Sequence, residues 1–421
     1  MKKISIFGYG VTTKPIVKFL AKQDQKCVIF DDKFSEQSYD EFGNLLLPSA
    51  CFRPENSELE ILSPGIPPYH PLILKAKNPI SEYDYFYSLF DKDYSPLTVW
   101  ISGTNGKTTT TEMLTLLLQN HRARSGGNIG TPLGELFMNK DSLWVLESSS
   151  FSIHYTQKAY PKLYLLLPVR EDHISWHGSF EAYMRDKLKP LKLMDSEGYA
   201  IIPKELSQAQ EVKDYKGTII FYEDSQSLAK ELGIQIKDIE FSEPFLLDGL
   251  LALCASKVLF GIADVKTLNT FKIGKHRIEE FLDMNSRLWV DDSKGTNVDA
   301  TLEAIKRYKN KKIFLILGGD DKGADQRPIF ELIKSFDIEV FGIGSNEEKL
   351  FDLSKEYGVK MHMCGHLKNA IDNIKQALKI DNVALLSPAA ASLDQFSSYK
   401  QRGELFKQYV LEDNLQDNKE L

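Results

Sequence analysis

The feature that most constrains this chain is a glycine turn, Ser102–Thr110, directly behind the apolar run Leu97–Ile101. A buried strand that ends in glycines, with Lys107 and Thr108 opening the next helix, is typical of a phosphate-binding loop. The glycines let backbone N–H groups approach an anion, Lys107 adds a full charge, and the Thr108 hydroxyl can bind Mg²⁺. The pattern therefore predicts a nucleoside triphosphate site.

The loop is shorter than the general phosphate-loop pattern, because Ile101 stands where that pattern has its first glycine. Its form is G-T-N-G-K-T. A glycine and threonine turn without a ligand, ahead of an ordinary helix, is the plain alternative. The residues predicted to contact the nucleotide here are Gly103, Thr104, Asn105, Gly106, Lys107, Thr108 and Thr109.

Length, charge and cysteine spacing limit the class of protein. The 421 residues are too many for one ordinary core and fit two or three α/β domains. The net charge of -7 and a pI near 5.7 argue against a nucleic-acid or membrane-surface binder. Four distant cysteines without a C-x-x-C pair predict a reduced, cytoplasmic protein. No run approaches the roughly 20 apolar residues of a membrane span, so no membrane insertion is expected.

The N-terminal segment has the pattern of a dinucleotide-binding unit. The strand run Lys3–Phe7 passes into Gly8-Tyr9-Gly10 and then a helical pattern, and a second strand run ends in Asp31 and Asp32. Thr13 replaces the third glycine of that motif. A nicotinamide site and a tight strand-to-helix turn without a ligand therefore both stay open.

Polar stretches divide the chain into three predicted α/β domains, 1–92, 93–273 and 274–421. The stretch Asp91–Pro96 predicts the first boundary, and Gly274–Arg277 predicts a hinge. After the hinge, strand runs alternate with helical stretches, which is the pattern of a parallel, doubly wound sheet. Such a sheet places its site in the loops that follow the strands. Those loops are 292–297, 320–325 and 387–392, and an acidic stretch, 412–417, predicts a frayed end.

Further polar groups follow the central strands. Glu147 ends a buried strand run, and a carboxylate there can hold Mg²⁺ against phosphates. Two histidines, His173 and His177, lie with two acids in the loop 168–178, which could be a metal or catalytic site or an ordinary solvated loop. On the next helix Lys187 stands among polar residues, and the helical pattern alone indicates a solvated lysine.

Together these motifs resemble those of the Mur ligases of peptidoglycan synthesis. They are G-T-N-G-K-T, G-N-I-G, E-S-S-S-F, E-D-H, H-R, D-S-K-G-T-N, G-G-D-D-K-G-A-D and L-S-P-A-A-A-S-L-D-Q-F, and they span all three predicted domains in order. The resemblance implies an N-terminal Rossmann-like UDP-binding domain, a central phosphate-loop ATPase-type domain and a C-terminal Rossmann-like, doubly wound domain. The last two motifs are similar to those of the branch that adds D-glutamate, and the D-N-P-R string of the diaminopimelate branch is absent.

The resemblance implies an ATP-dependent ligase that adds D-glutamate to UDP-N-acetylmuramoyl-L-alanine through an acyl phosphate. A monomer is expected. By family position, Lys107 and Thr108 hold the β- and γ-phosphates and a first Mg²⁺, with Glu147 as a further ligand of that ion. His173 lies beside a second Mg²⁺. Lys187 matches the lysine that the family carbamylates, and a carbamate offers the oxygens that a hard cation prefers, whereas an ammonium would repel the cation.

The resemblance also implies the remaining binding residues. The UDP part is held by Gly10, Val11, Thr12, Asp31, Asp32 and Gly65, and the muramoyl part by Asn128. Arg277 contacts ATP phosphate and Asp292 its ribose. D-glutamate is held by Lys294, Thr296, Lys322, Ser392 and Tyr399.

The chain departs from the family pattern at four positions. Pro168 and Ser175 replace the Asn and the Asp that flank the E-D-H motif, so contacts by those two side chains are not expected. Asp248 replaces an Asn of the adenine site and can accept but not donate a hydrogen bond. Tyr399 replaces a common Phe. Folylpolyglutamate synthetase, which shares the short loop and the carbamate, and an NTPase that uses hydrolysis for conformational work remain the alternatives.

Overall fold

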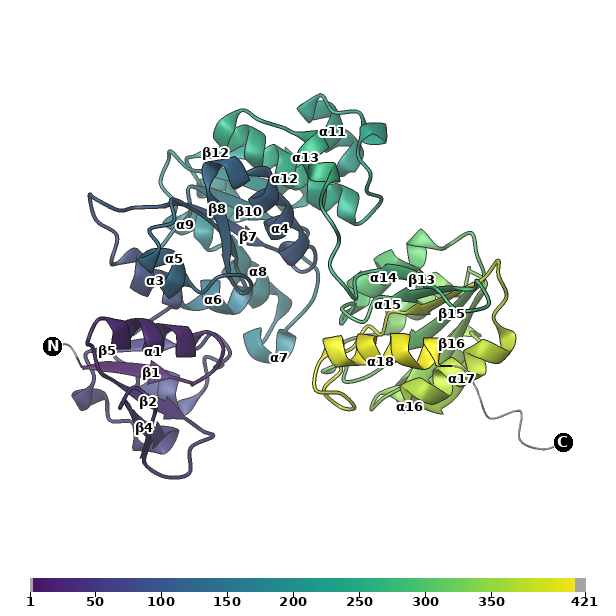
Figure 1. Ribbon diagram of the computed structural model, residues 1–421, viewed down its shortest axis with the longest axis horizontal. Coiled ribbons are helices and arrows are strands. Elements are labelled where there is room, and N and C mark those ends of the chain that lie inside the picture. Colours follow the sequence, from purple (N-terminus) through teal and green to yellow (C-terminus); the bar gives the residue numbers. More distant parts are fainter. Residues whose placement is uncertain (1–2, 413–421) are drawn as a thin grey trace. The chain divides into compact units, whose positions relative to one another are not determined.

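The computed structural model describes residues 3–412, so the predicted frayed stretch beyond Glu412 lies outside the described residues. The chain divides into two compact units, Met1–Phe271 and Lys272–Leu421. The first unit contains two sheets and the second contains one (Figure 1). Each sheet has six strands and is mostly parallel, which confirms the predicted α/β class. Within residues 3–412 no helix is both long and apolar enough to cross a membrane.

The first sheet has the strand order β3-β4-β2-β1-β5-β6, and only β3 pairs antiparallel. Its register aligns Phe7 at the end of β1 with Phe30 of β2 and Leu62 of β5. The loops that follow these three strands therefore leave from one edge of the sheet. The strands are β1 Ile4–Phe7, β2 Cys27–Asp31, β3 Ser38–Tyr39, β4 Leu45–Pro48, β5 Leu59–Leu62 and β6 Pro79–Ile80, and the helices are α1 Thr13–Lys22, α2 Pro71–Lys75 and α3 Glu82–Tyr87.

The second sheet is parallel throughout, with the order β12-β11-β10-β7-β9-β8. Its central strand β7 leads into the predicted phosphate loop. The strands are β7 Leu97–Ser102, β8 Ala123–Gly127, β9 Leu143–Glu147, β10 Leu163–Leu166, β11 Tyr199–Pro203 and β12 Thr218–Tyr222. The helices are α4 Lys107–Leu117, α5 Leu133–Met138, α6 Ser150–Tyr155, α7 Ile174–His177, α8 Phe180–Leu188, α9 Pro190–Leu193, α10 Gln210–Asp214, α11 Ser225–Leu232, α12 Phe245–Phe260 and α13 Val265–Asn269.

Two local features of this domain place predicted site residues. Gly126 and Gly127, directly ahead of Asn128, end strand β8. Glycine fits there because a Cβ on Gly126 would lie 2.7 Å from Leu136 Cδ1 and 2.8 Å from the Thr131 carbonyl oxygen. Helix α12 begins at Phe245, so Asp248 lies in its first turn.

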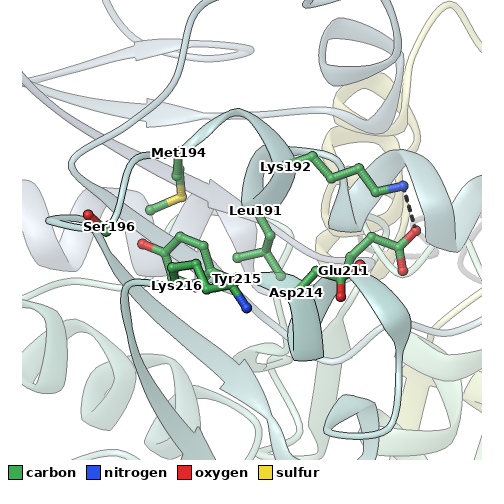
Figure 2. Close-up of a pocket in the computed structure, with 8 residues that line it drawn as sticks. All are labelled: Leu191, Lys192, Met194, Ser196, Glu211, Asp214, Tyr215 and Lys216. Atoms are coloured by element: carbon green, nitrogen blue, oxygen red, sulfur yellow. Dashed lines mark ion pairs between the residues drawn. The ribbon is translucent and has the colours of Figure 1, made fainter.

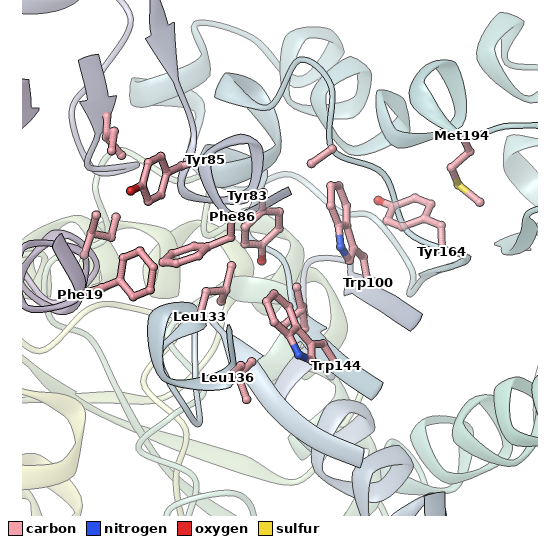
Figure 3. Close-up of a cluster of buried hydrophobic side chains, with 14 of the residues drawn as sticks. Phe19, Tyr83, Tyr85, Phe86, Trp100, Leu133, Leu136, Trp144, Tyr164 and Met194 are labelled. Carbon is pink, nitrogen blue, oxygen red and sulfur yellow. The ribbon is translucent and has the colours of Figure 1, made fainter. Parts of the chain in front are cut away.

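One hydrophobic core joins the first two sheets. Phe19 of α1 packs edge-to-face on Phe86 of α3 with ring centroids 5.1 Å apart, and the same cluster continues through Leu133 of α5 to Trp144 of β9 (Figure 3). Edge-to-face aromatic pairs contribute about 0.5–1.5 kcal/mol beyond their burial. Buried side chains of α1 and α3 therefore pack the first sheet's domain against α5 and β9 of the second.

A buried carboxylate strengthens this junction. Asp84 in α3 accepts hydrogen bonds from the backbone N–H groups of Gln157, Lys158 and Ala159, each at 2.8 Å. These three residues follow helix α6 of the second sheet. Asp84 is only 5% exposed, so its charge is balanced by three fixed peptide dipoles in place of water.

The second unit is a doubly wound sheet with the order β13-β14-β18-β15-β16-β17, in which only β13 runs antiparallel. The strands are β13 Glu279–Leu282, β14 Leu288–Asp291, β15 Ile313–Leu317, β16 Ile338–Ile343, β17 Met361–Gly365 and β18 Val383–Leu386. The helices are α14 Val298–Arg307, α15 Arg327–Ile333, α16 Glu347–Tyr357, α17 Leu367–Ala377 and α18 Tyr399–Leu411. Strands β14, β15 and β18 are adjacent, so the three polar loops predicted after them leave from neighbouring strand ends.

We expect Asp84→Ala to destabilise the first unit strongly, by about 3 kcal/mol or more, because three buried N–H groups lose their acceptor. Urea unfolding followed by fluorescence measures the change. Asp352→Ala is the matched control, since Asp352 is 79% exposed and pairs only across one helical turn with Lys355. Equal stability of the two variants would contradict the role given to Asp84.

Candidate active site

The predicted phosphate loop joins β7 to α4. Its glycines have positive φ, 142° at Gly103 and 80° at Gly106, which residues with a side chain rarely adopt. A Cβ on Gly103 would also collide with Leu167. Lys107 Nζ donates to the carbonyl oxygens of Gly103 and Thr104 at 3.0 and 2.7 Å, so the lysine is folded over the loop. The N–H groups at the start of α4 and one ammonium group can therefore serve one anion.

The other residues of the loop differ in how far their side chains are buried. Asn105 and Thr108 are half-buried, whereas Thr109 is buried on the inner side of α4. Asp248 of α12 lies directly against the loop, because a Cβ on Gly106 would collide with its Oδ1. The sequence resemblance implies an adenine contact for Asp248, and the structure places its carboxylate beside Gly106 of the predicted phosphate loop. Gly106 is thus required both by its φ and by the carboxylate next to it.

Thr104 ties the phosphate loop to the loop that follows β10. Its backbone N–H donates to the Pro168 carbonyl at 3.1 Å, and its hydroxyl accepts from the Arg170 N–H at 2.9 Å. The same hydroxyl lies 3.1 Å from Tyr183 Oη. The contact at position 168 uses a backbone carbonyl, which proline still offers, so the Pro168 departure leaves this junction intact.

Lys187 is buried under the phosphate loop. It is 1% exposed, and its Nζ donates to the Gly103 carbonyl at 2.8 Å and to Ser102 Oγ at 3.3 Å. Burial lowers the pKa of Lys187 well below its ordinary value, and the Lys107 charge acts in the same direction. The solvated lysine indicated by the helical pattern alone is therefore wrong. Helix α8 turns this polar position inward because its C-terminal end packs beneath the loop.

Glu147 is the last residue of β9, and only one of its two carboxylate oxygens accepts a hydrogen bond from the described residues. Oε1 accepts from Asn128 Nδ2 at 3.0 Å, and Asn128 also donates its backbone N–H to the Glu147 carbonyl at 2.9 Å. Oε2 is buried and has no hydrogen-bond partner among the described residues. A buried carboxylate oxygen of this kind suits a hard divalent cation. The structure thus brings the predicted residues Asn128 and Glu147 together.

His173 lies at the start of α7 in a left-handed conformation, with φ 55°. Its Nε2 is 3.5 Å from Asp172 Oδ2, and its ring packs on Phe151 at 4.7 Å between centroids. The side chain is 38% exposed, so it can reach a ligand from solvent. Ser175 follows in α7 and is exposed.

At the edge of the first sheet, the glycine turn after β1 is closed by hydrogen bonds. The Tyr9 N–H donates to Asp31 Oδ2 at 2.6 Å, and Thr13 Oγ1 donates to the Gly8 carbonyl at 2.6 Å while accepting from the Gly10 N–H at 3.1 Å. Thr13 is fully buried, so the missing third glycine is replaced by a hydroxyl that holds the turn.

The exposed groups of this edge surround that turn. Val11 is 93% exposed and Thr12 is half-buried. Asp32 pairs with His70 Nε2 at 2.9 Å. The nearby Ser49 hydroxyl and this His70 contact lower the pKa of Asp32. Gly65 is exposed in the loop after β5. The predicted UDP residues therefore come from three loops on one sheet edge.

In the second unit, the loop after β14 carries buried acids. Asp292 accepts from Ser387 Oγ at 2.6 Å and from the Ile278 N–H at 3.3 Å. Burial raises the pKa of Asp292 to about 7, which exceeds the opposite effect of the Ser387 hydrogen bond. Its neighbour Asp291 pairs with His276 Nδ1 at 2.6 Å. Arg277, which follows His276, is half-buried.

Arg402 is a residue that the motifs did not single out. It is fully buried in α18, where Nε donates to Ser293 Oγ at 2.9 Å and Nη2 donates to the carbonyls of Ser293 and Ala390. Ser293 Oγ in turn donates to the Tyr399 carbonyl at 2.8 Å. One guanidinium thus joins the loops after β14 and β18. The sequence does indicate that Arg402 is buried, because it lies four residues before Phe406 and eight before Val410, on the apolar face of its helix.

The predicted D-glutamate residues lie on these loops. Lys294 Nζ is 5.4 Å from the centre of the Tyr399 ring, and Thr296 is exposed nearby in the chain. Lys322 is exposed with φ 49°, in the loop after β15. That loop pairs with the loop of buried Ser392 through an Asp320–Ala391 bridge, in which each backbone N–H donates to the other carbonyl.

A separate hollow of about 400 Å³ lies beside α9 and α10 (Figure 2). Lys192 and Glu211 form an ion pair of 3.1 Å on its rim. None of the predicted site residues lines it. The hollow is lined by Leu191, Lys192, Met194, Ser196, Glu211, Asp214, Tyr215 and Lys216.

Comparison with known proteins agrees with this geometry. The family model described as "Mur ligase middle domain" matches residues 101–245, which include the phosphate loop and Lys187. Among solved structures, the MurF ligase of Thermotoga maritima in complex with ADP has a TM-score of 0.57 and 19% identity, covering 85% of this chain and 90% of that one. The UDP-N-acetylmuramate-alanine ligase of the same organism has a TM-score of 0.55 and 15% identity, covering 97% and 99%. The fold is thus that of the Mur ligases.

Sequence relatives define the branch. A protein of Helicobacter pylori strain 26695 named UDP-N-acetylmuramoylalanine--D-glutamate ligase is 49% identical over 98% of this chain and 100% of its own length. The protein of that name from Campylobacter jejuni strain RM1221 is 48% identical over 97% and 99%. The chain belongs to the Mur ligase family, within the group of UDP-N-acetylmuramoylalanine--D-glutamate ligases.

Gly106→Ala is expected to weaken nucleotide binding by at least about tenfold, because the added methyl group strains a positive φ and collides with Asp248. Titration with a fluorescent ATP analogue measures the affinity. Gly261→Ala is the control, since Gly261 has a similar φ of 72° but no atom within 4 Å of an added Cβ. Unchanged affinity in Gly106→Ala would exclude this loop as the phosphate cradle.

Proposed function

We propose that this chain is an ATP-dependent ligase that joins the amine of D-glutamate to the alanine carboxylate of UDP-N-acetylmuramoyl-L-alanine, releasing ADP and phosphate. This step belongs to the synthesis of peptidoglycan precursors. The observation that carries the proposal is near-full-length identity of 48–49% to ligases with that name. The buried lysine beneath a short phosphate loop supports it. We also propose that the enzyme acts as a monomer in the cytoplasm, where its nucleotide substrates occur.

The reaction needs activation because a carboxylate does not react with an amine. Its oxygen attacks the γ-phosphorus of ATP, ADP leaves, and an acyl phosphate forms. The amine then attacks the acyl carbon, a tetrahedral intermediate collapses, and phosphate leaves with the amide bond formed. Two anions must meet in the first step, so positive charge between them lowers the barrier.

Lys107 and the loop supply part of that charge. In the structure, Lys107 donates hydrogen bonds to the Gly103 and Thr104 carbonyls. In this proposal its ammonium group would donate to the phosphates of bound ATP. The backbone N–H groups of 103–109 surround the β-phosphate in this proposal. Asp248 beside Gly106 is the unfavourable element, since its carboxylate would lie near the phosphates.

Lys187 is suited to become a carbamate. Its lowered pKa leaves a neutral amine whose lone pair attacks the carbon of CO₂; loss of one proton then gives an N-carboxylate. The product carries a negative charge, which the neighbouring Lys107 ammonium group stabilises. The new oxygens would lie beneath the phosphate loop, where the amine now contacts the Gly103 carbonyl.

The residues present fit Mg²⁺, because Glu147 Oε2 is a buried acceptor with no partner within residues 3–412. Thr108, Glu147, His173 and the carbamate of Lys187 would hold two such ions. When bound, Mg²⁺ supplies positive charge between the γ-phosphate and the substrate carboxylate. Asn128 keeps Glu147 in place through Oε1.

The three predicted domains divide the substrates. Residues 1–92 would hold the UDP part at the sheet edge formed by Gly10, Val11, Thr12, Asp31, Asp32 and Gly65, with Asn128 of 93–273 on the muramoyl part. In 274–421, Arg277 and Asp292 would contact ATP, and the D-glutamate residues would be Lys294, Thr296, Lys322, Ser392 and Tyr399. Lysine and hydroxyl groups suit a dicarboxylate amino acid, which offers four acceptor oxygens.

Phosphate release in the presence of ATP tests this function. We expect release with UDP-N-acetylmuramoyl-L-alanine and D-glutamate together, and a fall to background when either is omitted. Turnover that persists undiminished without them would favour an NTPase that couples hydrolysis to conformational work. Replacing the UDP precursor by a folate tests the folylpolyglutamate alternative.

Lys187→Ala should be nearly inactive, because it removes the carbamate and its metal-binding oxygens. Acetate, a short carboxylic acid that fits the vacated volume, should restore part of the activity. Lys192→Ala is the control: its side chain is 58% exposed, so activity should be normal and acetate without effect. Normal activity of Lys187→Ala would refute the carbamate.

Lys322→Ala should raise the KM for D-glutamate on the order of tenfold, since a charged hydrogen bond to a carboxylate contributes about 1.5–3 kcal/mol. The KM for ATP should stay within about twofold. Steady-state kinetics with each substrate varied separates the two, and exposed Lys334→Ala serves as the control. A defect confined to ATP would place Lys322 elsewhere in the mechanism.

A further inference from the structure

Three side chains outside the ligase machinery converge on one point between helices α6, α7 and α8. Asp186 Oδ2 lies 2.9 Å from His154 Nδ1 and 2.8 Å from His177 Nδ1. The three ligand atoms all lie within 4.8 Å of one another. The sequence pairs His177 with His173 in one loop as a candidate metal site, whereas the structure turns His177 toward Asp186 and His154.

We propose that His154, His177 and Asp186 bind a divalent cation of the zinc type. Two imidazole nitrogens and one carboxylate oxygen are a ligand set typical of Zn²⁺ sites with an open fourth position. Mg²⁺ prefers oxygen ligands, so this site is chemically distinct from the magnesium sites proposed at the phosphate loop. In tetrahedral geometry the ligand atoms would stand about 3.3 Å apart, so each hydrogen-bonded contact opens by only a few tenths of an ångström.

The histidine rings are already oriented for this role. His177 Nδ1 donates to Asp186 Oδ2 in the structure, and Nε2 lies 3.0 Å from Ser150 Oγ. With an ion on Nδ1 the ring proton would move to Nε2, where the Ser150 hydroxyl can accept it. Such a second hydrogen bond is the usual support of a metal-binding histidine. Trp176 packs on both rings, with centroids 4.4 Å from His177 and 5.1 Å from His154. The rings therefore need little reorganisation to bind an ion.

The three ligand side chains are unequally buried, and the site is open to solvent on the side of His154. The His177 side chain is fully buried, Asp186 is 15% exposed and His154 is 32% exposed. An ion can thus enter past His154, and water can complete its coordination. The ammonium group of Lys189, at the C-terminal end of α8, donates to the His154 carbonyl.

A second histidine and carboxylate group in the chain lacks these features. His276 pairs with Asp291 at 2.6 Å, but Glu279 accepts the His276 backbone N–H and pairs with Lys407. This second group offers a single imidazole ring, and one of its two carboxylates, Glu279, already pairs with Lys407. The comparison favours the site at α6, α7 and α8.

An ion at this site would cross-link the helix that follows Glu147 to the helix that carries Lys187. Asp186 directly precedes Lys187 in α8, and His154 lies in α6. Zn²⁺ binds the folded arrangement only, so it should raise the thermal unfolding temperature in proportion to the logarithm of its concentration. The inference does not depend on the ligase activity.

Zinc binding to the full, chelator-treated chain tests the proposal, using competition with a chromophoric chelator in excess Mg²⁺. We expect one Zn²⁺ per chain, bound more than about tenfold more weakly in His154→Gln, His177→Gln and Asp186→Asn. His362→Gln is the matched control, because His362 pairs with Glu339 at 3.2 Å outside the cluster. Glu147→Gln alters the proposed magnesium site and leaves the three zinc ligands in place, so this variant should bind Zn²⁺ normally.

Two outcomes would overturn the proposal: no Zn²⁺ bound by the wild-type chain, or equal affinity in all variants. If a variant unfolds, the wild-type chain still decides. Long-range nitrogen NMR should show Zn²⁺ shifting the Nδ1 signals of His154 and His177, and unshifted signals would exclude the site. Loss of ligase activity with intact zinc binding would count against the proposed function alone.

Discussion

The active-site region depends on one backbone carbonyl that serves two lysines. Gly103 accepts from Lys107 at 3.0 Å and from Lys187 at 2.8 Å. Two ammonium groups cannot share one buried acceptor without strong repulsion, and Lys187, the more buried of the two, has its pKa lowered by burial and by the Lys107 charge. The same loop therefore carries a cation, which in the proposed function would face the phosphates, and a neutral amine beneath it. A carbamate on Lys187 would replace this neutral amine by an anion, which the Lys107 ammonium group attracts.

Buried hydrogen bonds fix the two lysines, Lys107 and Lys187, in position relative to the central sheet of the first unit. Thr104 binds the loop after β10, and Tyr164 Oη holds the Lys187 carbonyl at 2.5 Å, so α8 cannot slide relative to the sheet without breaking buried hydrogen bonds. Asp84 and the aromatic core fasten the first sheet to the second. In the proposed reaction, a substrate at the strand ends of the first sheet would thus be positioned by buried, hydrogen-bonded elements, as a reaction between two anions requires.

Much of the fold and of the site was predictable because the relevant signals are local. Strand runs ending in glycine or acidic residues predicted β1, β2, β7 and β9, and the short loop predicted a phosphate cradle. The errors came from residues whose environment is set by distant segments. Lys187 lies in a helix with an ordinary polar pattern, yet its neighbours 84 residues earlier in sequence bury it. Arg402 joins Ser293, 109 residues away, and no spacing rule connects the two.

The sequence by itself determined the α/β class, the order of the motifs and the chemistry of the phosphate loop, because backbone turns and strand ends follow from residues next to one another. Only the tertiary structure decided which groups meet. It set the low pKa of Lys187, the available oxygen of Glu147, the carboxylate of Asp248 beside Gly106, and the convergence of His154 and His177 on Asp186. Burial and proximity of groups far apart in the chain control these properties, and such proximity arises only when the sheets and helices pack.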